Sequence, residues 1–287
     1  MLRALLTVTL SSLGLGCASG AGPRTGFADV NGTRLAYEVR GEGDPVVLIH
    51  GGLVDSRMWD DQVEPFAQSH RVIRYDLRGF GKSAFSTGPF SHVEDLKALL
   101  DDLHVERASL VGVSVGGNTA LDFALEHPER VADLVLVNSS LRGYKAQPLA
   151  ESVAVNRAAA EQGMETAIEL WLRHPLFASG RDNPEFERRM RQMLADNWRF
   201  WGPENSITVT WPSPPTLERL SAVAAPTLIV VGDRDAPHIL GMADSLATRI
   251  PGARRVFIQG ASHHPNMERP AEFNRIVLEF LSRTQGA

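Results

Sequence analysis

The chain has 287 residues and carries 29 Lys and Arg against 34 Asp and Glu, a formal net charge of −5. Hydrophobic residues make up 43% and charged residues 22%, a globular balance that excludes general disorder. A pI of about 6.0 without a run of basic residues leaves no electrostatic footprint for binding nucleic acid. The single cysteine, Cys17, can form neither an internal disulfide nor a cysteine-based metal site.

The first 22 residues have the pattern of an export signal. Arg3 precedes an uncharged run over 4–16 that ends at Cys17. This run is shorter than the about 20 residues that span a bilayer, but it suits the apolar core of a signal peptide. A cysteine at this point resembles a bacterial lipoprotein signal, although Gly14 stands where Leu is usual. We therefore expect residues 1–22 to be a leader. It would tether the protein to a membrane through a lipid on Cys17, direct plain secretion, or be an extension without a targeting role that leaves the protein in the cytoplasm.

Short apolar runs alternate with helical patterns through the first half of the chain. Two runs flank Asn31-Gly32, a strong hairpin-turn signal. Near-continuous apolar runs of five or six residues are typical of strands buried on both faces of a parallel sheet. The expected strands are Phe27–Val30, Arg34–Val39, Val46–His50, Arg71–Tyr75, Ala108–Val113, Asp133–Val137, Thr227–Val231 and Arg254–Gln259, and helices are expected over His92–His104 and Asn118–His127. The alternation predicts an α/β fold with a mostly parallel twisted sheet flanked by helices.

This rhythm breaks between residues 141 and 221. The segment has a helical pattern, ends in a proline-rich stretch, and holds four of the five tryptophans: Trp171, Trp198, Trp201 and Trp211. We expect a helical cap over 141–221, inserted into a core made of 23–140 and 222–287, because ligands bind at the carboxyl ends of the strands in such sheets. Trp171 is the candidate contact with substrate. The alternative is that these tryptophans only pack the interior of the cap.

The strand Ala108–Val113 runs into Gly112-Val113-Ser114-Val115-Gly116 and then into a helix. The G-x-S-x-G pattern alone is a weak signal, but a strand before it and a helix after it are the context of a nucleophile elbow. Side chains two residues from a serine on such a turn would collide, which explains the glycines. Ser114 is therefore the candidate nucleophile.

A serine nucleophile needs a base, and the base needs an acid to orient it. Downstream, Gly232-Asp233-Arg234-Asp235 follows one expected strand, and Gly260-Ala261-Ser262-His263-His264-Pro265 follows the next. With this Ser–Asp–His order, the sequence resembles the α/β-hydrolase fold superfamily, in particular its small capped esterases and lactonases, from about Phe27 to Leu281.

The resemblance implies roles for the downstream residues. It selects Asp235 as the catalytic acid and leaves Asp233 to cap the turn. It places His263 at the position of the base and His264 at the variable position beside it, where we expect a substrate contact. Ser262 stands where the family commonly has a second glycine.

Two further loops carry the resemblance. His50-Gly51-Gly52 ends an expected strand and resembles the oxyanion loop, which nominates the backbone N–H groups of Gly52 and Val115 as donors to the oxyanion. His50 would shape that loop rather than act as a base. The segment from Asp76 to Ser83 resembles another family signature, in which Asp76 would brace the active-site loops and the glycines would permit a tight turn.

These parts predict a serine hydrolase that cleaves a small carboxylic ester or lactone through an acyl-enzyme on Ser114. The sequence has no metal cluster and no dinucleotide fingerprint, so no cofactor is expected. Alternatives are a carbon–carbon bond hydrolase with the same triad, a perhydrolase or haloperoxidase side activity, and a ligand-binding protein that keeps the fold without turnover.

Overall fold

The computed structural model describes residues 22–86, 88–146, 150–181, 183–197 and 209–284. Cys17 lies outside the described residues, so the prediction of export or lipid attachment stays a prediction. Trp198 and Trp201 lie outside them as well. The strands are β1 (Arg24–Val30), β2 (Thr33–Arg40), β3 (Asp44–Ile49), β4 (His70–Tyr75), β5 (Ala108–Val113), β6 (Val131–Val137), β7 (Thr227–Gly232) and β8 (Arg254–Ile258). The α-helices are α1 (Asp60–Ala67), α2 (His92–Asp102), α3 (Val115–Glu126), α4 (Ala150–Glu161), α5 (Met164–Leu172), α6 (Pro184–Asp196), α7 (Thr216–Arg219), α8 (Pro237–Arg249), α9 (Pro265–Glu268) and α10 (Pro270–Thr284).

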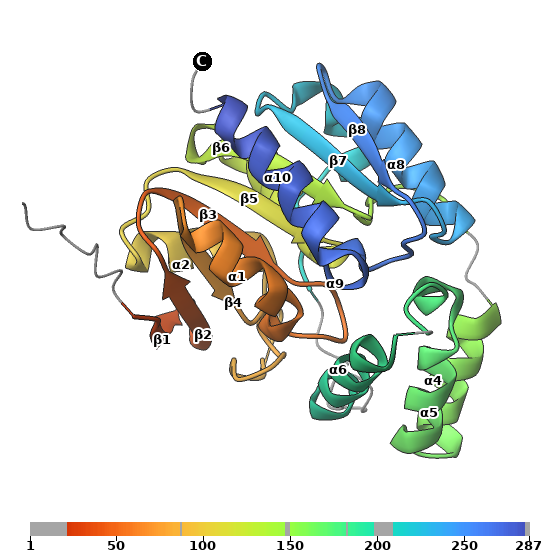
Figure 1. Cartoon of the computed structure of the whole chain (residues 1–287). Coiled ribbons are helices and arrows are strands. Elements are labelled where there is room, and N and C mark those ends of the chain that lie inside the picture. Colours follow the sequence, from red (N-terminus) through yellow and green to blue (C-terminus); the bar gives the residue numbers. More distant parts are fainter. Residues whose placement is uncertain (1–21, 87, 147–149, 182, 198–208, 285–287) are drawn as a thin grey trace, which may run out of the picture.

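The strands form one eight-stranded sheet in the order β1-β2-β4-β3-β5-β6-β7-β8 (Figure 1). The hairpin turns at Asn31 and Gly32, both with positive φ, and β2 pairs antiparallel with β1 and β4. From β4 to β8 all pairs are parallel. The α/β fold predicted from the apolar runs is confirmed, and the observed strands lie within three residues of the expected ends.

Side chains of the central strands alternate between two cores, as the period of two in a strand requires. Val47 and Ile49 of β3 pack on the face that α2, α3 and α8 cover. Val46 and Leu48 pack on the opposite face with residues of α1, α9 and α10. Because both faces are covered by helices, β3, β5 and β7 are apolar almost throughout, which is why they were recognisable in the sequence.

The chain leaves the sheet after β6 and returns at β7. Between these strands, α4, α5 and α6 form a group at one end of the sheet, separate from the flanking layers (Figure 1). The apolar side chains of α5 and α6, such as Ile168 and Met190, continue the core that faces α10. The returning segment contacts the core again, since Thr216 donates to Asp122 of α3 over 2.6 Å. The predicted division at residues 140 and 221 stays a prediction about domain organisation.

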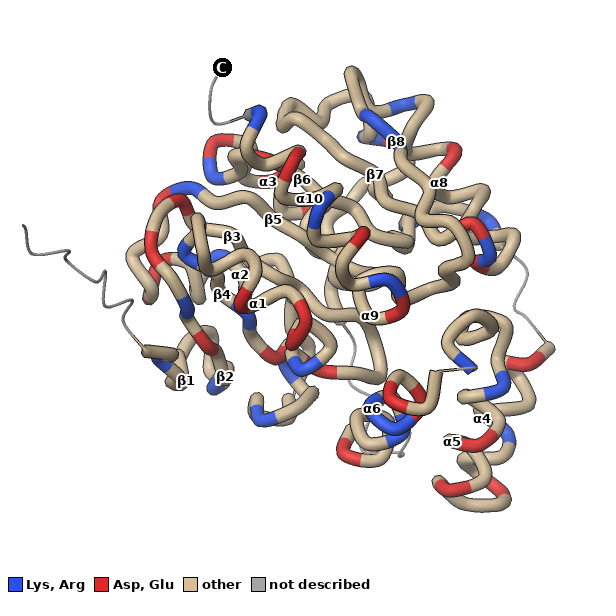
Figure 2. The backbone as a smooth tube through the Cα atoms, in the orientation of Figure 1, with Lys and Arg blue, Asp and Glu red and all other residues tan. Residues whose placement is uncertain are grey.

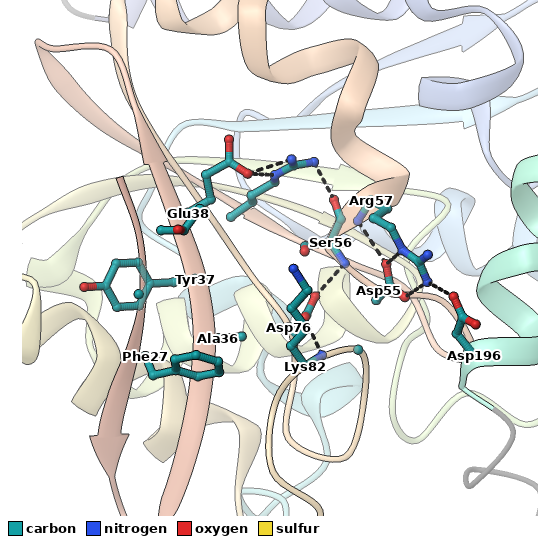
Figure 3. A pocket seen from close by; sticks show the side chains of 14 residues that line it. Phe27, Ala36, Tyr37, Glu38, Asp55, Ser56, Arg57, Asp76, Lys82 and Asp196 are labelled. Atoms are coloured by element: carbon teal, nitrogen blue, oxygen red, sulfur yellow. Dashed lines mark hydrogen bonds and ion pairs between the residues drawn. The ribbon is translucent and has the colours of Figure 1, made fainter. Parts of the chain in front are cut away.

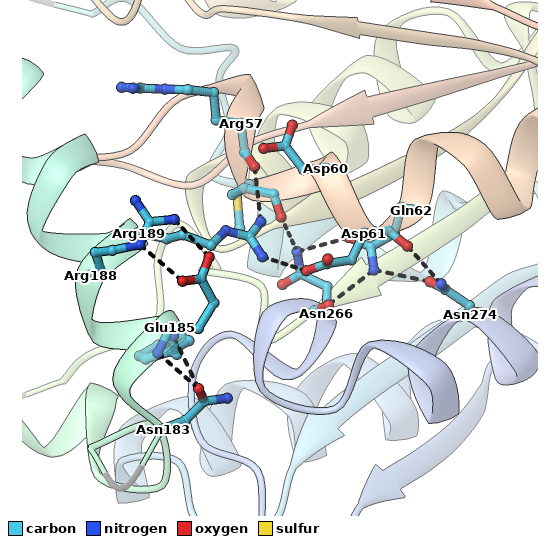
Figure 4. Close-up of polar contacts among 12 residues, drawn as sticks. Arg57, Asp60, Asp61, Gln62, Asn183, Glu185, Arg188, Arg189, Asn266 and Asn274 are labelled. Atoms are coloured by element: carbon cyan, nitrogen blue, oxygen red, sulfur yellow. Dashed lines mark hydrogen bonds and ion pairs between the residues drawn. The ribbon is translucent and has the colours of Figure 1, made fainter.

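Polar side chains join α6 to the core (Figure 4). Arg189 of α6 forms an ion pair of 2.6 Å with Asp61 of α1 and donates to the carbonyl of Arg57. Beside it, the Gln62 amide donates to the carbonyl of Asn266 and to the side chain of Asn274, both over 2.9 Å. Helix α6, helix α1 and the segment after His264 are thus joined by hydrogen bonds.

Acidic and basic residues are intermixed on the described part of the chain, and α6 carries both signs (Figure 2). Two pairs lie within α6 itself, Arg188 with Glu185 over 2.7 Å and Arg191 with Glu187 over 3.2 Å. Such exposed pairs contribute little to stability. Among the described residues, no helix combines the length and the apolar character needed to span a bilayer.

Two glycines set the distance between β5, α3 and β3. A Cβ atom on Gly112 would lie 2.3 Å from the carbonyl oxygen of Gly116, and one on Gly116 would lie 2.3 Å from the carbonyl oxygen of Ile49. Because both obstacles are backbone atoms, they cannot move aside without shifting helix α3 or strand β3. The G-x-S-x-G spacing is therefore a packing requirement.

We predict that Gly116→Ala lowers the free energy of unfolding by at least about 2 kcal/mol, through the overpacking of a closed core. Gly51→Ala is the matched control, since its Cβ would meet its nearest neighbours at 3.7 Å, an ordinary contact. Urea unfolding of both variants checks the prediction. Equal losses of stability would contradict the steric argument.

Candidate active site

Ser114 lies on the turn between β5 and α3 in a strained conformation, with φ 53° and ψ −115°. Few residues other than glycine adopt positive φ, and such strain persists only where surrounding contacts enforce it. Its N–H donates to the carbonyl of Val137 over 3.1 Å. Its carbonyl accepts from the N–H of Asn118 and from both the N–H and the hydroxyl of Ser140. The side chain is half-buried at the start of α3.

Asp235 and His263 lie side by side although 28 residues separate them. Asp235 follows β7 and His263 follows β8, and the two parallel strands end next to each other. Nδ1 of His263 lies 2.7 Å from one carboxylate oxygen of Asp235, and the other oxygen accepts the N–H of Ala236 over 2.6 Å. A carboxylate can only accept here, so Nδ1 carries the proton and Nε2 keeps its lone pair. Asp233 instead accepts the N–H of Gly260 over 2.7 Å.

The surroundings of His263 favour its protonated form. Burial alone would lower its pKa, but the charge of Asp235, the hydrogen bond to it and the charge of Glu268 together raise the pKa above 6.5. The imidazole is therefore a stronger base than a free one, and it is oriented by a carboxylate.

His50 sets the direction of the Gly52 N–H. Its Nε2 accepts the N–H of Leu77 over 2.8 Å, so Nδ1 carries the proton and donates to the carbonyl of Gly51 over 2.7 Å. Burial lowers the pKa of His50, which keeps it neutral. In a trans peptide the carbonyl and the following N–H point in opposite directions. With the Gly51 carbonyl turned toward His50, the Gly52 N–H points away from it.

The loop at Gly51 and Gly52 passes beside the serine. A Cβ atom on Gly51 would lie 3.7 Å from the Cβ of Ser114, and one on Gly52 would lie 3.9 Å from Val115. A cavity of about 210 Å³ is bordered by both Gly52 and Val115. The structure thus brings the two expected oxyanion donors to one place next to Ser114.

The two expected substrate contacts lie in the packing between cap and core. His264 is 3% exposed, and its ring stacks on Phe177 at 5.2 Å with an angle of 12° between planes. Burial lowers its pKa well below 6.5. Trp171 contacts His174 and Phe177, with ring centroids 4.7 and 5.7 Å apart. Contact of either residue with substrate stays a prediction.

Asn138 is a site residue that the sequence reasoning missed. It follows β6 with φ 38° and is 1% exposed. Its amide donates to the carbonyl of Ser262 over 2.7 Å and accepts the N–H of Gly232 over 3.1 Å. One side chain therefore connects the loop that carries His263 to the end of the strand before Asp235. The signal was available, because a polar residue directly follows the apolar strand β6.

Glu268 is the second missed residue. Its buried carboxylate accepts the N–H groups of Ser262 and His264, the two neighbours of His263, over 2.8 Å each. It also accepts the hydroxyl of Ser262 over 3.1 Å and that of Ser179, which comes from the cap. The hydroxyl that Ser262 has in place of glycine thus takes part in this network.

The cap also contacts the histidine loop through its backbone. In η3 (Pro175–Phe177) the carbonyl of Leu176 accepts the N–H of His263 over 3.1 Å. Asn138, Glu268 and Leu176 together hold the backbone on both sides of the histidine. The position of the imidazole therefore depends on the core and on the cap at once.

A larger groove of about 700 Å³ lies between the β1–β2 hairpin and the loops after β3 and β4 (Figure 3). Several of its charged side chains are paired with one another: Arg57 bonds Asp55 over 2.6 Å and Asp196 over 2.8 Å. Asp76 accepts the N–H groups of Ser56 and Lys82, over 2.9 and 2.8 Å, and so braces both loops. The groove has none of the expected catalytic residues in its lining, and we do not assign the chemistry to it.

Within the described residues, His, Cys, Asp and Glu form no group of three that could hold a metal ion.

The profile of the Alpha/beta hydrolase family matches residues 46–276. The chain belongs to the α/β hydrolase family. Its relatives include enzymes named as esterases, lactonases and hydrolases.

Three relatives show the extent of the similarity to known α/β hydrolases. The 2-hydroxy-6-oxononadienedioate/2-hydroxy-6-oxononatrienedioate hydrolase of Cupriavidus pinatubonensis is 30% identical over 255 residues, which covers 83% of this chain and 86% of the relative. The enol-lactonase from Burkholderia xenovorans LB400 superposes with a TM-score of 0.75 at 27% identity, covering 90% of this chain and 100% of that one. A thermophilic esterase from Thermogutta terrifontis superposes with a TM-score of 0.77 at 29% identity, which covers 91% of this chain and 99% of the esterase.

The raised pKa of His263 predicts the pH dependence of this α/β hydrolase. A protonated imidazole cannot accept a proton, so kcat/KM should fall as the pH drops through a midpoint above 6.5. Asp235→Asn removes the charge that raises the pKa. The residual activity should therefore titrate at lower pH and be reduced about 10³–10⁴-fold. Rate profiles from pH 4.5 to 9 measure both, and a wild-type midpoint below 6.5 would refute the assignment.

For Glu268→Gln we predict a ten- to hundredfold lower kcat with little change in KM. The amide keeps only one acceptor oxygen, so one of the two N–H groups that flank His263 loses its partner and the imidazole shifts. Steady-state kinetics measure kcat and KM separately. The control is Glu279→Gln, which changes an exposed carboxylate on α10. If both variants keep wild-type kcat, Glu268 does not position the base.

Proposed function

We propose that this α/β hydrolase cleaves small carboxylic esters or lactones through an acyl-enzyme on Ser114, without a cofactor. The observation that carries the proposal is the buried pair of Asp235 and His263, with Nδ1 and carboxylate 2.7 Å apart. It lies in a loop network that also holds the strained backbone of Ser114. A buried acid–base pair in the same loop network as a serine elbow supports acyl transfer, which uses these three groups.

In the proposed reaction the Ser114 hydroxyl attacks the substrate carbonyl while Nε2 of His263 takes its proton. A bond forms between the serine oxygen and the carbonyl carbon, and the carbonyl oxygen becomes an oxyanion. The bond to the leaving alcohol then breaks, and His263 returns the proton to that alcohol. Water repeats both steps on the acyl-enzyme and releases the acid, while Asp235 stabilises the imidazolium in each half.

The proposed oxyanion donors are the N–H groups of Gly52 and Val115. Val115 is the first residue of α3, where backbone N–H groups lack partners within the helix and the helix dipole favours negative charge. His50 holds the Gly52 peptide in one orientation before substrate arrives. Such preorganised donors typically contribute about 10²–10³-fold each to the rate.

The relatives' names support a small-molecule substrate, since one is an enol-lactonase and another an esterase. A second candidate is hydrolysis of a carbon–carbon bond, because one relative is named as a hydrolase of 2-hydroxy-6-oxononadienedioate. A dioate carries two carboxylates, which need cationic partners. Arg78 borders the cavity beside the oxyanion donors, but its charge is already paired with Asp95 over 2.5 Å. This favours the ester or lactone.

The test is covalent labelling together with turnover. Wild-type protein should hydrolyse p-nitrophenyl acetate continuously and gain one adduct from a fluorophosphonate at Ser114, by peptide mass spectrometry. We predict that Ser114→Ala loses both, with turnover reduced by at least about 10³-fold and an unchanged melting temperature.

Ser282→Ala, at an exposed position on α10, is the matched control and should retain both properties. Labelling with a single burst and no steady turnover would favour the ligand-binding alternative. Near wild-type turnover in Ser114→Ala would overturn the proposal.

A further inference from the structure

The cavity next to Gly52 and Val115 is formed by segments far apart in the sequence. Its walls are formed by the loop after β4, the start of α2 and the segment that returns to β7. That segment is fixed to the loop, because the N–H and the hydroxyl of Thr210 both donate to the carbonyl of Phe90, over 2.6 and 2.9 Å. The helices α4, α5 and α6 contribute no described residue to the lining. The cavity is therefore built from the core and the returning segment together.

Aromatic side chains dominate the walls of this cavity. They are Phe80, Phe85, Phe90 and Trp211. An engineered apolar cavity of about 150 Å³ in another protein binds benzene. A volume of about 210 Å³ therefore accommodates one six-membered ring with a small substituent.

Two of the polar side chains in the wall already have partners. Arg78 is 7% exposed and bonds both oxygens of Asp95, over 2.8 and 2.5 Å, while its guanidinium lies 4.9 Å from the ring of Phe90. Ser86 donates to the carbonyl of Gly88 over 2.6 Å. With its positive charge neutralised, the cavity is suited to a neutral group rather than to an anion.

His92 is different. It begins α2, is 3% exposed, and packs edge-on against Phe90 at 4.9 Å and tilted against Trp211 at 5.8 Å. Its Nδ1 is buried without a hydrogen-bond partner among the described residues. Burial, with the nearby His50 and Arg78, lowers the pKa of His92 to about 3, so the ring is neutral near pH 7. Buried polar groups without a partner are rare in folded proteins and call for an explanation.

We propose that this cavity binds a ring-bearing part of the ester or lactone substrate, and that His92 pairs with a hydroxyl or carbonyl group on that ring. The inference rests on the proposed function and deepens it. It names the substrate class as esters or lactones with a neutral, oxygen-substituted ring next to the reacting bond. A neutral imidazole has one N–H and one lone pair, so it can donate to a carbonyl or accept from a hydroxyl. The ring belongs to the acyl part or to the alcohol part, and substrates distinguish the two.

The experiment compares substrate pairs that differ by one hydroxyl group. Methyl phenylacetate and methyl 4-hydroxyphenylacetate test the acyl side; benzyl acetate and 3-hydroxybenzyl acetate test the alcohol side. In wild-type protein we expect kcat/KM to favour the hydroxylated member of one pair. In His92→Phe, which keeps an aromatic ring and removes both nitrogens, that preference should fall about tenfold, the size of one buried hydrogen bond.

His127→Phe is the matched control. Its Nε2 is also buried without a partner in the described structure, and its ring packs on Phe123 at 5.0 Å. It lies at the opposite end of α3 from Val115, about 18 Å away along the helix axis. This variant should leave both substrate preferences unchanged.

A binding measurement separates failure of this inference from failure of the proposed function. Phenol should bind wild-type protein more tightly than toluene, and His92→Phe should remove the difference, by NMR titration. If phenol shows this dependence but no ester is hydrolysed, the proposed function fails and the cavity assignment stands. If esters are hydrolysed but no hydroxyl preference and no phenol preference depends on His92, the cavity assignment is overturned. The assignment is also overturned if His92→Phe and His127→Phe lose the hydroxyl preference to the same extent.

Discussion

The left-handed backbone of Ser114 is the constraint on which the rest of the site depends. A non-glycine residue in this region costs about 1–3 kcal/mol, and the cost is met by contacts elsewhere. Here the contacts are four hydrogen bonds of the Ser114 backbone: its N–H donates to Val137, and its carbonyl accepts from Asn118 and twice from Ser140. They are possible only because Gly112 and Gly116 let β5, α3 and β3 approach without Cβ atoms between them. The strained backbone of Ser114 therefore depends on the close packing of β5, α3 and β3 around it.

Parallel strands then bring the remaining groups to the serine. β5, β6, β7 and β8 are neighbours in the sheet and end at the same edge. The loops that follow them are hydrogen-bonded to one another: Ser140 reaches Ser114, and Asn138 reaches both Gly232 and Ser262. Buried polar groups in such a network have their partners inside the protein, so the loops keep one arrangement. Preorganisation of this kind avoids rearrangement during the proposed reaction.

The segment between β6 and β7 also contacts the loop that carries His263. The carbonyl of Leu176 accepts the N–H of His263, Ser179 bonds the neighbouring Ser262, and Phe177 stacks on His264. A displacement of η3 would therefore disturb the base as well as open the site. By contrast, the aromatic cavity beside Gly52 is lined in the described structure by the core and the returning segment. Positioning of the base and selection of the ring are thus carried by different parts of the insertion.

The sequence by itself determined the strands, the hairpin and the elbow, because these depend on local patterns. Apolar runs identify strands covered on both faces, Asn31-Gly32 identifies a tight turn, and two glycines around Ser114 identify a junction where side chains do not fit. The choice of Asp235 over Asp233 and of His263 over His264 came from a family resemblance, since both members of each pair share a loop. The tertiary structure decided what depends on long-range contacts. These are the hydrogen bond between Asp235 and His263, the hydrogen bonds of Asn138 and Glu268 to the loop around His263, and the His92 nitrogen that has no partner among the described residues. No local pattern encodes these, because each depends on which loops the order of the strands places side by side.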